Sequence, residues 1–144
     1  MQVKRIAMRL GIGMFVAMLG LAAGVHAQSR PQFQRIASLL RLAGYSHTVD
    51  TTRGWLRDGE SATFSIWLAG GRDYAVAGLC DADCSDVDLV LYGSDGAPVA
   101  WDRMYDDQPI TRVMPPRSGL YRLRVSMADC ERAPCEYMVG VFRR

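Results

Sequence analysis

The sequence predicts an all-β protein, an antiparallel β-sandwich or barrel of about eight strands with one short helix on its N-terminal side. Beyond residue 50, apolar and polar residues alternate, which is the period of a half-buried strand. The alternating segments are short, and turns rich in Gly, Pro, Asp and Ser separate them. No apolar window beyond residue 50 keeps a 3.6-residue period, so the pattern excludes a helical domain.

The first 27 residues have the pattern of a cleavable signal peptide. Residues 1–9 hold three basic residues and no acidic one, residues 10–25 are apolar, and Val25 and Ala27 put small residues at positions −3 and −1 of a cleavage site. A membrane-spanning helix needs about 20 apolar residues, and this run is shorter. We therefore expect a bacterial periplasmic or secreted protein, cleaved near Ala27, that meets the membrane only during export.

Removal of this segment changes the charge of the chain. The 144 residues include 17 basic and 15 acidic residues, for a formal net charge of +2. Three of the basic residues and none of the acidic ones lie in residues 1–27, so 14 basic and 15 acidic residues remain and the net charge becomes −1. Since a nucleic-acid-binding domain needs a basic surface, we expect no nucleic-acid partner.

Residues 31–43 predict the short helix, because apolar residues recur there at helical spacing and Gly44 suits a C-terminal stop. The helix either packs on the domain or precedes it on a tether. Residues 45–50 are expected to form a connector. The segment 28–50 would then precede a β-domain that spans 51–144.

The period of two defines eight strands beyond residue 50. The clearest is 121–127, where four apolar residues alternate with polar ones. The expected strands are 51–56, 64–68, 74–80, 87–92, 98–102, 110–114, 121–127 and 137–141. Their expected core consists of Phe64, Ile66, Leu68, Val76, Leu89, Leu91, Tyr121, Leu123, Val125, Tyr137 and Val139.

The four cysteines predict two disulfides, because an even number of cysteines in an exported chain indicates pairing. Three pairings are possible for four cysteines. We expect Cys80–Cys84 and Cys130–Cys135, since the members of each pair are close in sequence and lie at strand ends. The alternative is a four-thiolate zinc site, which the spacing permits but an oxidising compartment disfavours.

Several segments, in this order and spacing, resemble the bacterial pre-peptidase C-terminal domain. They are Leu56–Gly59, Leu68–Tyr74, Asp86–Tyr92 with Gly96, and Ser118–Val125. The resemblance covers about residues 53–143 and implies a β-sandwich of the jelly-roll type. Domains of this family usually accompany secreted proteases and are thought to aid secretion, targeting or substrate binding. Because this sequence shows no protease domain and adds two cysteine loops, it looks like a stand-alone periplasmic relative, to which the role beside a protease does not carry over.

Asp81, Asp83, Asp86 and Asp88 form a candidate calcium site. They fall within eight residues, and Ca²⁺ takes six to eight oxygen ligands, which clustered carboxylates supply. The spacing is not that of an EF-hand loop. The alternative, which we favour, is a turn whose Asp side chains accept hydrogen bonds from backbone N–H groups. No cofactor other than calcium is expected.

Trp67 is a candidate ligand-binding residue, because it is out of phase with Phe64, Ile66 and Leu68 in its strand. An exposed tryptophan can stack on a sugar ring or anchor a partner protein. The alternative is that both faces of this strand are buried, as is common in sandwiches.

The sequence contains no recognisable catalytic constellation, so we expect a protein that is not an enzyme. His47 is the single histidine beyond residue 27, and no Gly-x-Ser-x-Gly elbow is present. The main hypothesis is a non-catalytic exported binding or interaction module with a disulfide-stapled β-sandwich. The alternatives are a calcium-stabilised carbohydrate- or peptidoglycan-binding domain, and an inhibitor of an envelope hydrolase. The expected partner is an envelope protein or a glycan.

Overall fold

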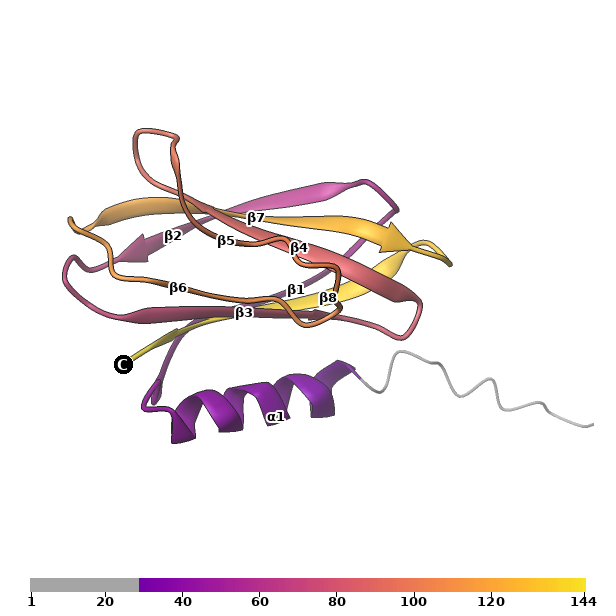
Figure 1. Cartoon of the computed structure of the whole chain (residues 1–144), viewed down its shortest axis with the longest axis horizontal. Coiled ribbons are helices and arrows are strands. Elements are labelled where there is room, and N and C mark those ends of the chain that lie inside the picture. Colours follow the sequence, from indigo (N-terminus) through magenta and orange to yellow (C-terminus); the bar gives the residue numbers. More distant parts are fainter. Residues whose placement is uncertain (1–28) are drawn as a thin grey trace, which may run out of the picture.

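The computed structural model describes residues 29–144 and contains one helix and two four-stranded antiparallel sheets (Figure 1). The elements are α1 Ser29–Leu42, β1 His47–Leu56, β2 Ser61–Leu68, β3 Tyr74–Cys80, β4 Cys84–Tyr92, β5 Pro98–Asp102, β6 Ile110–Val113, β7 Gly119–Cys130 and β8 Cys135–Arg143.

The strand order is that of an eight-stranded jelly roll. Sheet A has the order β1-β8-β3-β6, and sheet B has the order β2-β7-β4-β5. The chain therefore crosses repeatedly between the two sheets, as the two Greek keys of a jelly roll require. The predicted all-β sandwich with a short N-terminal helix is confirmed, and the barrel alternative does not apply.

The predicted signal peptide, residues 1–27, lies outside the described residues. Within residues 29–144, no helix is both long enough and apolar enough to cross a membrane.

The largest difference from the expected elements is at the first strand. The predicted connector 45–50 was wrong for its last four residues, because β1 already begins at His47 and pairs with β8 as far as Arg143. Residues 47–50 are all exposed, since β1 lies at the edge of sheet A. An edge segment that is exposed on both faces has no apolar alternation, so the sequence pattern could not reveal it.

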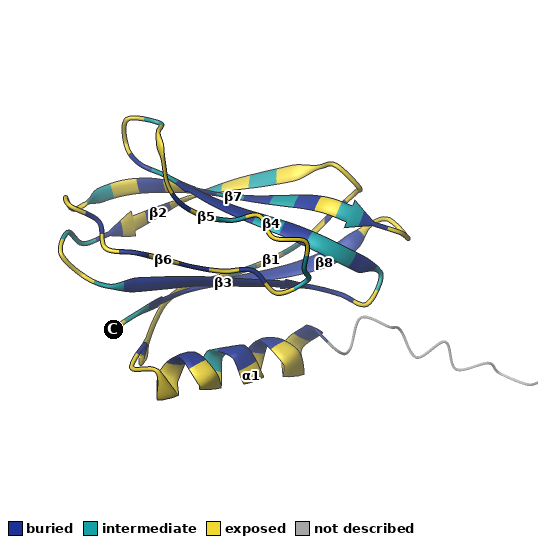
Figure 2. Cartoon of the chain, in the orientation of Figure 1, coloured by how far each residue is buried: buried dark blue, intermediate teal, exposed yellow. Residues whose placement is uncertain are grey.

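The main core lies between the two sheets and contains the residues that the alternation predicts. Ten of the eleven expected residues are buried in this cluster, and the eleventh, Phe64, packs against it partly buried. The four cysteines and seven further residues also belong to it, namely Leu56, Tyr74, Val87, Ala100, Val113, Met127 and Val141. Figure 2 shows the alternation of buried and exposed residues along β2 and β7, whose outer face is open to solvent.

The outer face of sheet A is covered by α1, so the helix packs on the domain and is not on a tether (Figure 1). Phe33, Ile36 and Leu40 point from the helix toward β3 and β8. The facing positions include the small residues Ala75 and Ala77, which let the helix approach closely. Burial on both faces explains why all residues of β3 and all of β8 up to Phe142 are buried.

Gly44 ends the helix as its sequence position predicts. Its φ is +96°, a left-handed conformation that favours glycine. The Gly44 N–H donates to the Arg41 carbonyl (3.0 Å), and the Tyr45 N–H donates to the Leu40 carbonyl (2.9 Å). This is the Schellman pair of hydrogen bonds, and Tyr45 packs into the same cluster as Leu40.

We predict that Gly140→Ala destabilises the protein by about 1–3 kcal/mol, the cost of overpacking a core. A Cβ at this position would lie 2.6 Å from Cζ of the buried Phe33 ring and 2.8 Å from the Phe142 ring. Gly119→Ala is the matched control, because nothing lies within 4 Å of the Cβ that it adds. Chemical denaturation measures both. Equal effects of the two substitutions would contradict the close packing of α1 on β8.

Candidate functional site

Both disulfides lie at one end of the sandwich and pair as expected, Cys80–Cys84 and Cys130–Cys135. Their Cα–Cα distances are 5.8 and 6.0 Å, within the usual range. Cys84 and Cys130 are Cα partners across β4 and β7, so the two bridges are neighbours. We call this region the disulfide end, and it consists of the loops 57–60, 81–83, 103–109 and 131–134.

The carboxylate of Asp81 accepts hydrogen bonds from backbone N–H groups near the disulfide end. Its side chain is buried, and its Oδ2 accepts a hydrogen bond from the Glu136 N–H at 2.8 Å. Its Oδ1 accepts the Asp83 N–H at 3.3 Å. Asp83 in turn pairs with Arg132 of the next loop at 2.7 Å. These two carboxylates therefore brace the loops 81–83 and 131–134 against β8 and against each other.

Asp86 and Asp88 are half-buried on β4 and face other acidic groups. Burial, and then the carboxylate of Asp88, raise the pKa of Asp86, and the carboxylates of Asp106 and Asp129 add to this. The Oδ1 atom of Asp86 is buried and has no hydrogen-bond partner among residues 29–144. Burial is also the main reason that the pKa of Asp88 is raised, although Arg103 and Arg124 oppose the shift.

The calcium site stays a prediction. Within residues 29–144, no group of three or more His, Cys, Asp or Glu side chains is arranged to hold a metal ion. Asp81 accepts hydrogen bonds from backbone N–H groups, as the alternative of a turn capped by Asp side chains predicted. Asp83 forms an ion pair with Arg132, which that alternative did not include.

A buried glutamate connects the disulfide end to the helix. Glu136 has no exposed surface, and its Oε2 accepts a hydrogen bond from the hydroxyl of Ser29 at 2.8 Å. Its Oε1 forms an ion pair with Arg53 of β1. One carboxylate thus joins α1, β1 and β8, and the backbone of the same residue holds Asp81. The sequence pattern was not used to predict a role for Glu136. An acidic residue within the apolar stretch 135–142 could have indicated a buried and paired carboxylate.

The loop 103–109 is held by hydrogen bonds to one strand of each sheet. Its carbonyl groups accept hydrogen bonds from β3 of sheet A and from β4 of sheet B, so it acts as a short pairing segment for both. The hydrogen bonds run from Gly78 N–H to Pro109 (2.8 Å), from Cys80 N–H to Asp107 (3.1 Å) and from Val87 N–H to Asp106 (3.1 Å).

Two large side chains project from this loop into solvent. Met104 is 70% exposed and Tyr105 is 71% exposed. The Tyr105 hydroxyl donates a hydrogen bond to Asp129 Oδ2 at 2.7 Å, which raises the pKa of the tyrosine and orients its ring. The exposure of these two side chains could not be predicted from the sequence, because a loop has no apolar periodicity that would indicate which residues face solvent.

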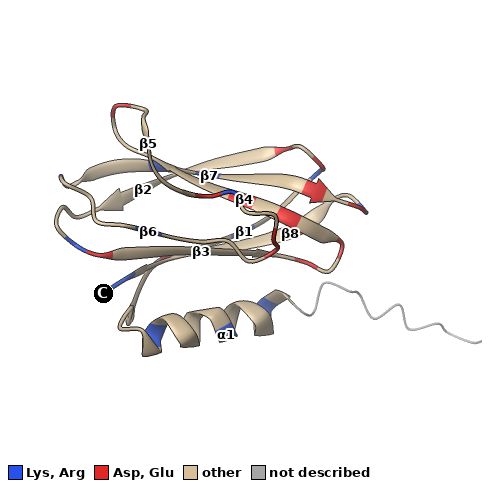
Figure 3. Ribbon diagram, in the orientation of Figure 1, with Lys and Arg blue, Asp and Glu red and all other residues tan. Residues whose placement is uncertain are grey.

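The disulfide end is acidic. Its four loops contain seven acidic residues and three arginines, and Asp86, Asp102 and Asp129 lie on the adjoining strand ends. The loops 69–73, 93–97 and 114–118 at the opposite end contain two acidic residues and two arginines. In Figure 3 the acidic residues gather at the end toward which β7 runs.

Trp67 lies on the outer face of sheet B, as its phase predicts, and is 59% exposed. Trp101 on β5 shares this face and is also exposed. The alternative of a tryptophan buried on a two-sided strand is therefore wrong. The outer face of sheet B is a second candidate surface, separate from the disulfide end.

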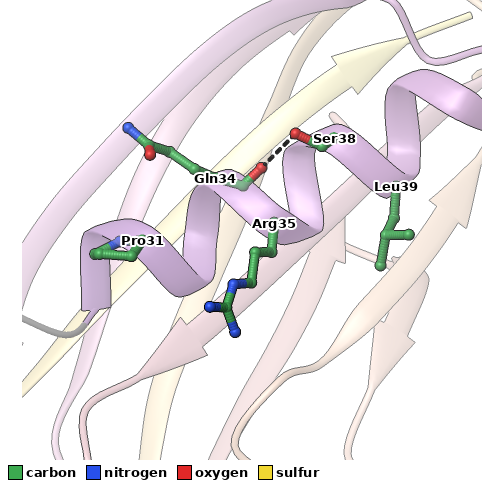
Figure 4. Close-up of a pocket in the computed structure, with 5 residues that line it drawn as sticks. All are labelled: Pro31, Gln34, Arg35, Ser38 and Leu39. Atoms are coloured by element: carbon green, nitrogen blue, oxygen red, sulfur yellow. Dashed lines mark hydrogen bonds between the residues drawn. The ribbon is translucent and has the colours of Figure 1, made fainter.

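A further hollow of about 600 Å³ lies on the outer face of α1 (Figure 4). Its lining residues are Pro31, Gln34, Arg35, Ser38 and Leu39. The Ser38 hydroxyl donates to the Gln34 carbonyl within the helix, and Arg35 is the one charged group of the lining. This arrangement brings no set of convergent polar groups together, so we do not regard it as the site.

The comparisons with known proteins identify the fold. No protein-family model matches the sequence, and no curated protein matches it. Among solved structures, the chain is similar to PliG from Aeromonas hydrophila, a periplasmic inhibitor of g-type lysozyme. The sequence identity is 12%, the TM-score is 0.52, and the match covers 68% of this chain and 87% of that chain. At this identity the likeness shows a shared fold, and the resemblance to the pre-peptidase C-terminal domain stays a prediction.

We predict that Asp86→Asn stabilises the protein at pH 7 and not at pH 3. Because the pKa of Asp86 is raised in the folded state, protonation of its carboxylate stabilises the folded protein. This stabilisation is lost as the pH rises through the folded-state pKa. Asparagine keeps the neutral form at every pH. The gain is about 0.5 kcal/mol, because solvent screens a half-buried charge.

Urea denaturation at both pH values tests this prediction. Asp95→Asn, in an exposed turn at the opposite end, is the control and should have little effect. A gain of the same size at pH 3 and pH 7, or a loss at pH 7, would show that carboxylate repulsion does not act at Asp86.

Proposed function

We propose that this protein is an exported, non-catalytic binding protein that inhibits an envelope hydrolase, a glycan-cleaving enzyme of the lysozyme kind. The observation that carries the proposal is the fold that the chain shares with the periplasmic inhibitor of g-type lysozyme. That match covers most of the inhibitor's chain, so the likeness extends over its domain and is not limited to one motif.

The disulfide end has the properties of an inhibitory surface. Its loops are braced by two disulfides, by the Asp83–Arg132 ion pair and by the hydrogen bonds of loop 103–109. A loop that is already ordered loses little conformational entropy on binding, which increases affinity. Met104 and Tyr105 project from it, and methionine and tyrosine are enriched at the centres of protein interfaces.

The charge of this end indicates the kind of hydrolase that it fits. Acidic residues surround Tyr105, so a partner with a basic surface around its cleft would be attracted and oriented. The association rate would then decrease as salt is added.

The disulfides also support the proposed location. Disulfides form and persist in oxidising compartments such as the periplasm, in agreement with the predicted signal peptide. Export would bring the protein into the compartment where envelope hydrolases act.

We predict that the purified, oxidised protein inhibits peptidoglycan cleavage by a g-type lysozyme or another peptidoglycan hydrolase, and that Tyr105→Ala weakens inhibition at least tenfold. A tenfold change corresponds to about 1.4 kcal/mol, which is modest for an interface tyrosine. The readout is the inhibition constant from the clearing of a peptidoglycan suspension.

Trp67→Ala is the control for this prediction, because it removes an equally large exposed aromatic side chain from sheet B. It should leave the inhibition constant unchanged. If the unaltered protein inhibits no enzyme in a panel of lysozyme classes, the proposed function is wrong. If Trp67→Ala weakens inhibition and Tyr105→Ala does not, the inhibitory surface is not the disulfide end.

A further inference from the structure

The outer face of sheet B carries two neighbouring arginines without ion-pair partners. Arg122 and Arg124 are two residues apart on β7, so both side chains project from the same face of the sheet. Within residues 29–144, neither arginine has a carboxylate within 4.0 Å of its guanidinium. The Nε atom of Arg124 is buried and has no hydrogen-bond acceptor in the part of the chain that the structure describes.

These arginines line a hollow of about 290 Å³ together with Thr63, Tyr92 and Gly96. Its size is at the lower limit for small-molecule sites, which span about 300–1,000 Å³. The Arg124 guanidinium carbon lies over the Tyr92 ring, 5.6 Å from its centroid, and this cation–π contact limits the freedom of the side chain. The lining of the hollow therefore combines two guanidinium groups with the aromatic ring of Tyr92 and the hydroxyl group of Thr63.

The turn 93–97 closes one side of the hollow. Gly96 has a φ of +83°, and a Cβ at this position would lie 3.4 Å from an Nη atom of Arg122. Glycine thus allows the turn to approach the Arg122 guanidinium closely.

Two guanidinium groups on one face that form no direct ion pair within residues 29–144 favour an anion. The half-buried carboxylate of Asp88 on β4 acts electrostatically on Arg124 but does not form an ion pair with it. A planar guanidinium matches a carboxylate with two parallel hydrogen bonds, and a charge-assisted bond is roughly twice as strong as a neutral one.

The aromatic residues around the hollow indicate that the anion belongs to a sugar. Trp67 pairs with Leu120 on β7, which makes it a diagonal neighbour of Arg122, about 7–8 Å away between Cα atoms. Trp101 is in the same cross-strand row as Arg124, with Val90 between them. Exposed indole rings on both sides offer flat apolar surfaces to sugar rings that extend beyond the hollow.

We propose that this hollow on sheet B binds a carboxylate-bearing sugar of an envelope glycan, with Arg122 and Arg124 on the carboxylate. The site is distinct from the disulfide end, so one protein would hold the glycan and a glycan-cleaving enzyme on different surfaces.

The test is a nuclear magnetic resonance titration of the oxidised protein with two sugars that differ in one group. N-acetylmuramic acid carries a lactyl carboxylate that N-acetylglucosamine lacks. We expect the acid to bind at least tenfold more tightly, with shift changes at Arg122, Arg124 and Tyr92. Arg122→Gln and Arg124→Gln should each abolish the difference, and Arg35→Gln on the exposed face of α1 should keep it.

Several outcomes would overturn the proposal. Equal binding of the two sugars would show that the carboxylate is not recognised, and lactate binding as tightly as the sugar acid would show an anion site without sugar recognition. A peptide rich in aspartate and glutamate that binds better than the sugar acid would assign the surface to a protein.

Because Arg122 is exposed, Arg122→Gln should fold even if Arg124→Gln does not. The sheet B variants should still inhibit the hydrolase, so a failure here is distinguishable from a failure of the proposed function.

Discussion

The buried carboxylate of Glu136 is the contact on which the arrangement of this protein depends. It accepts the hydroxyl of Ser29 and pairs with Arg53, so it ties the start of α1 and the edge strand β1 to β8. Removing one partner of a buried ion pair typically costs about 3–5 kcal/mol, because the other charge is left uncompensated. The backbone N–H of the same residue holds Asp81, so the position of α1 and the geometry of the loop 81–83 both depend on where Glu136 lies.

The helix makes the two faces of the sandwich unequal. Because α1 covers sheet A, the strands β3 and β8 are buried on both faces and contribute to stability. Within residues 29–144 no helix covers sheet B, and its outer face presents arginines and tryptophans to solvent. The disulfide end differs from both, since its loops are acidic and are held by covalent and hydrogen bonds. The fold thus presents two chemically different surfaces to solvent.

The sequence predicted the fold well where one face of a strand is buried, since alternation such as that of Tyr121, Leu123 and Val125 reports burial directly. It also predicted the disulfide pairing, because sulfurs close in sequence at strand ends have few other partners. It did not predict Glu136 or the contacts of Tyr105, which depend on residues 107 and 24 positions away in the chain. Local periodicity contains no information about such distant contacts.

Hydrogen–deuterium exchange of the protein, alone and with a hydrolase that it inhibits, is the sharpest test of the proposal that the loops of the disulfide end bind a glycan-cleaving enzyme. Binding at this end is expected to slow exchange in residues 103–109 and 131–134 and to leave the turns 93–97 and 114–118 unchanged. Protection of those two turns, with no change in 103–109, would show that the enzyme binds elsewhere.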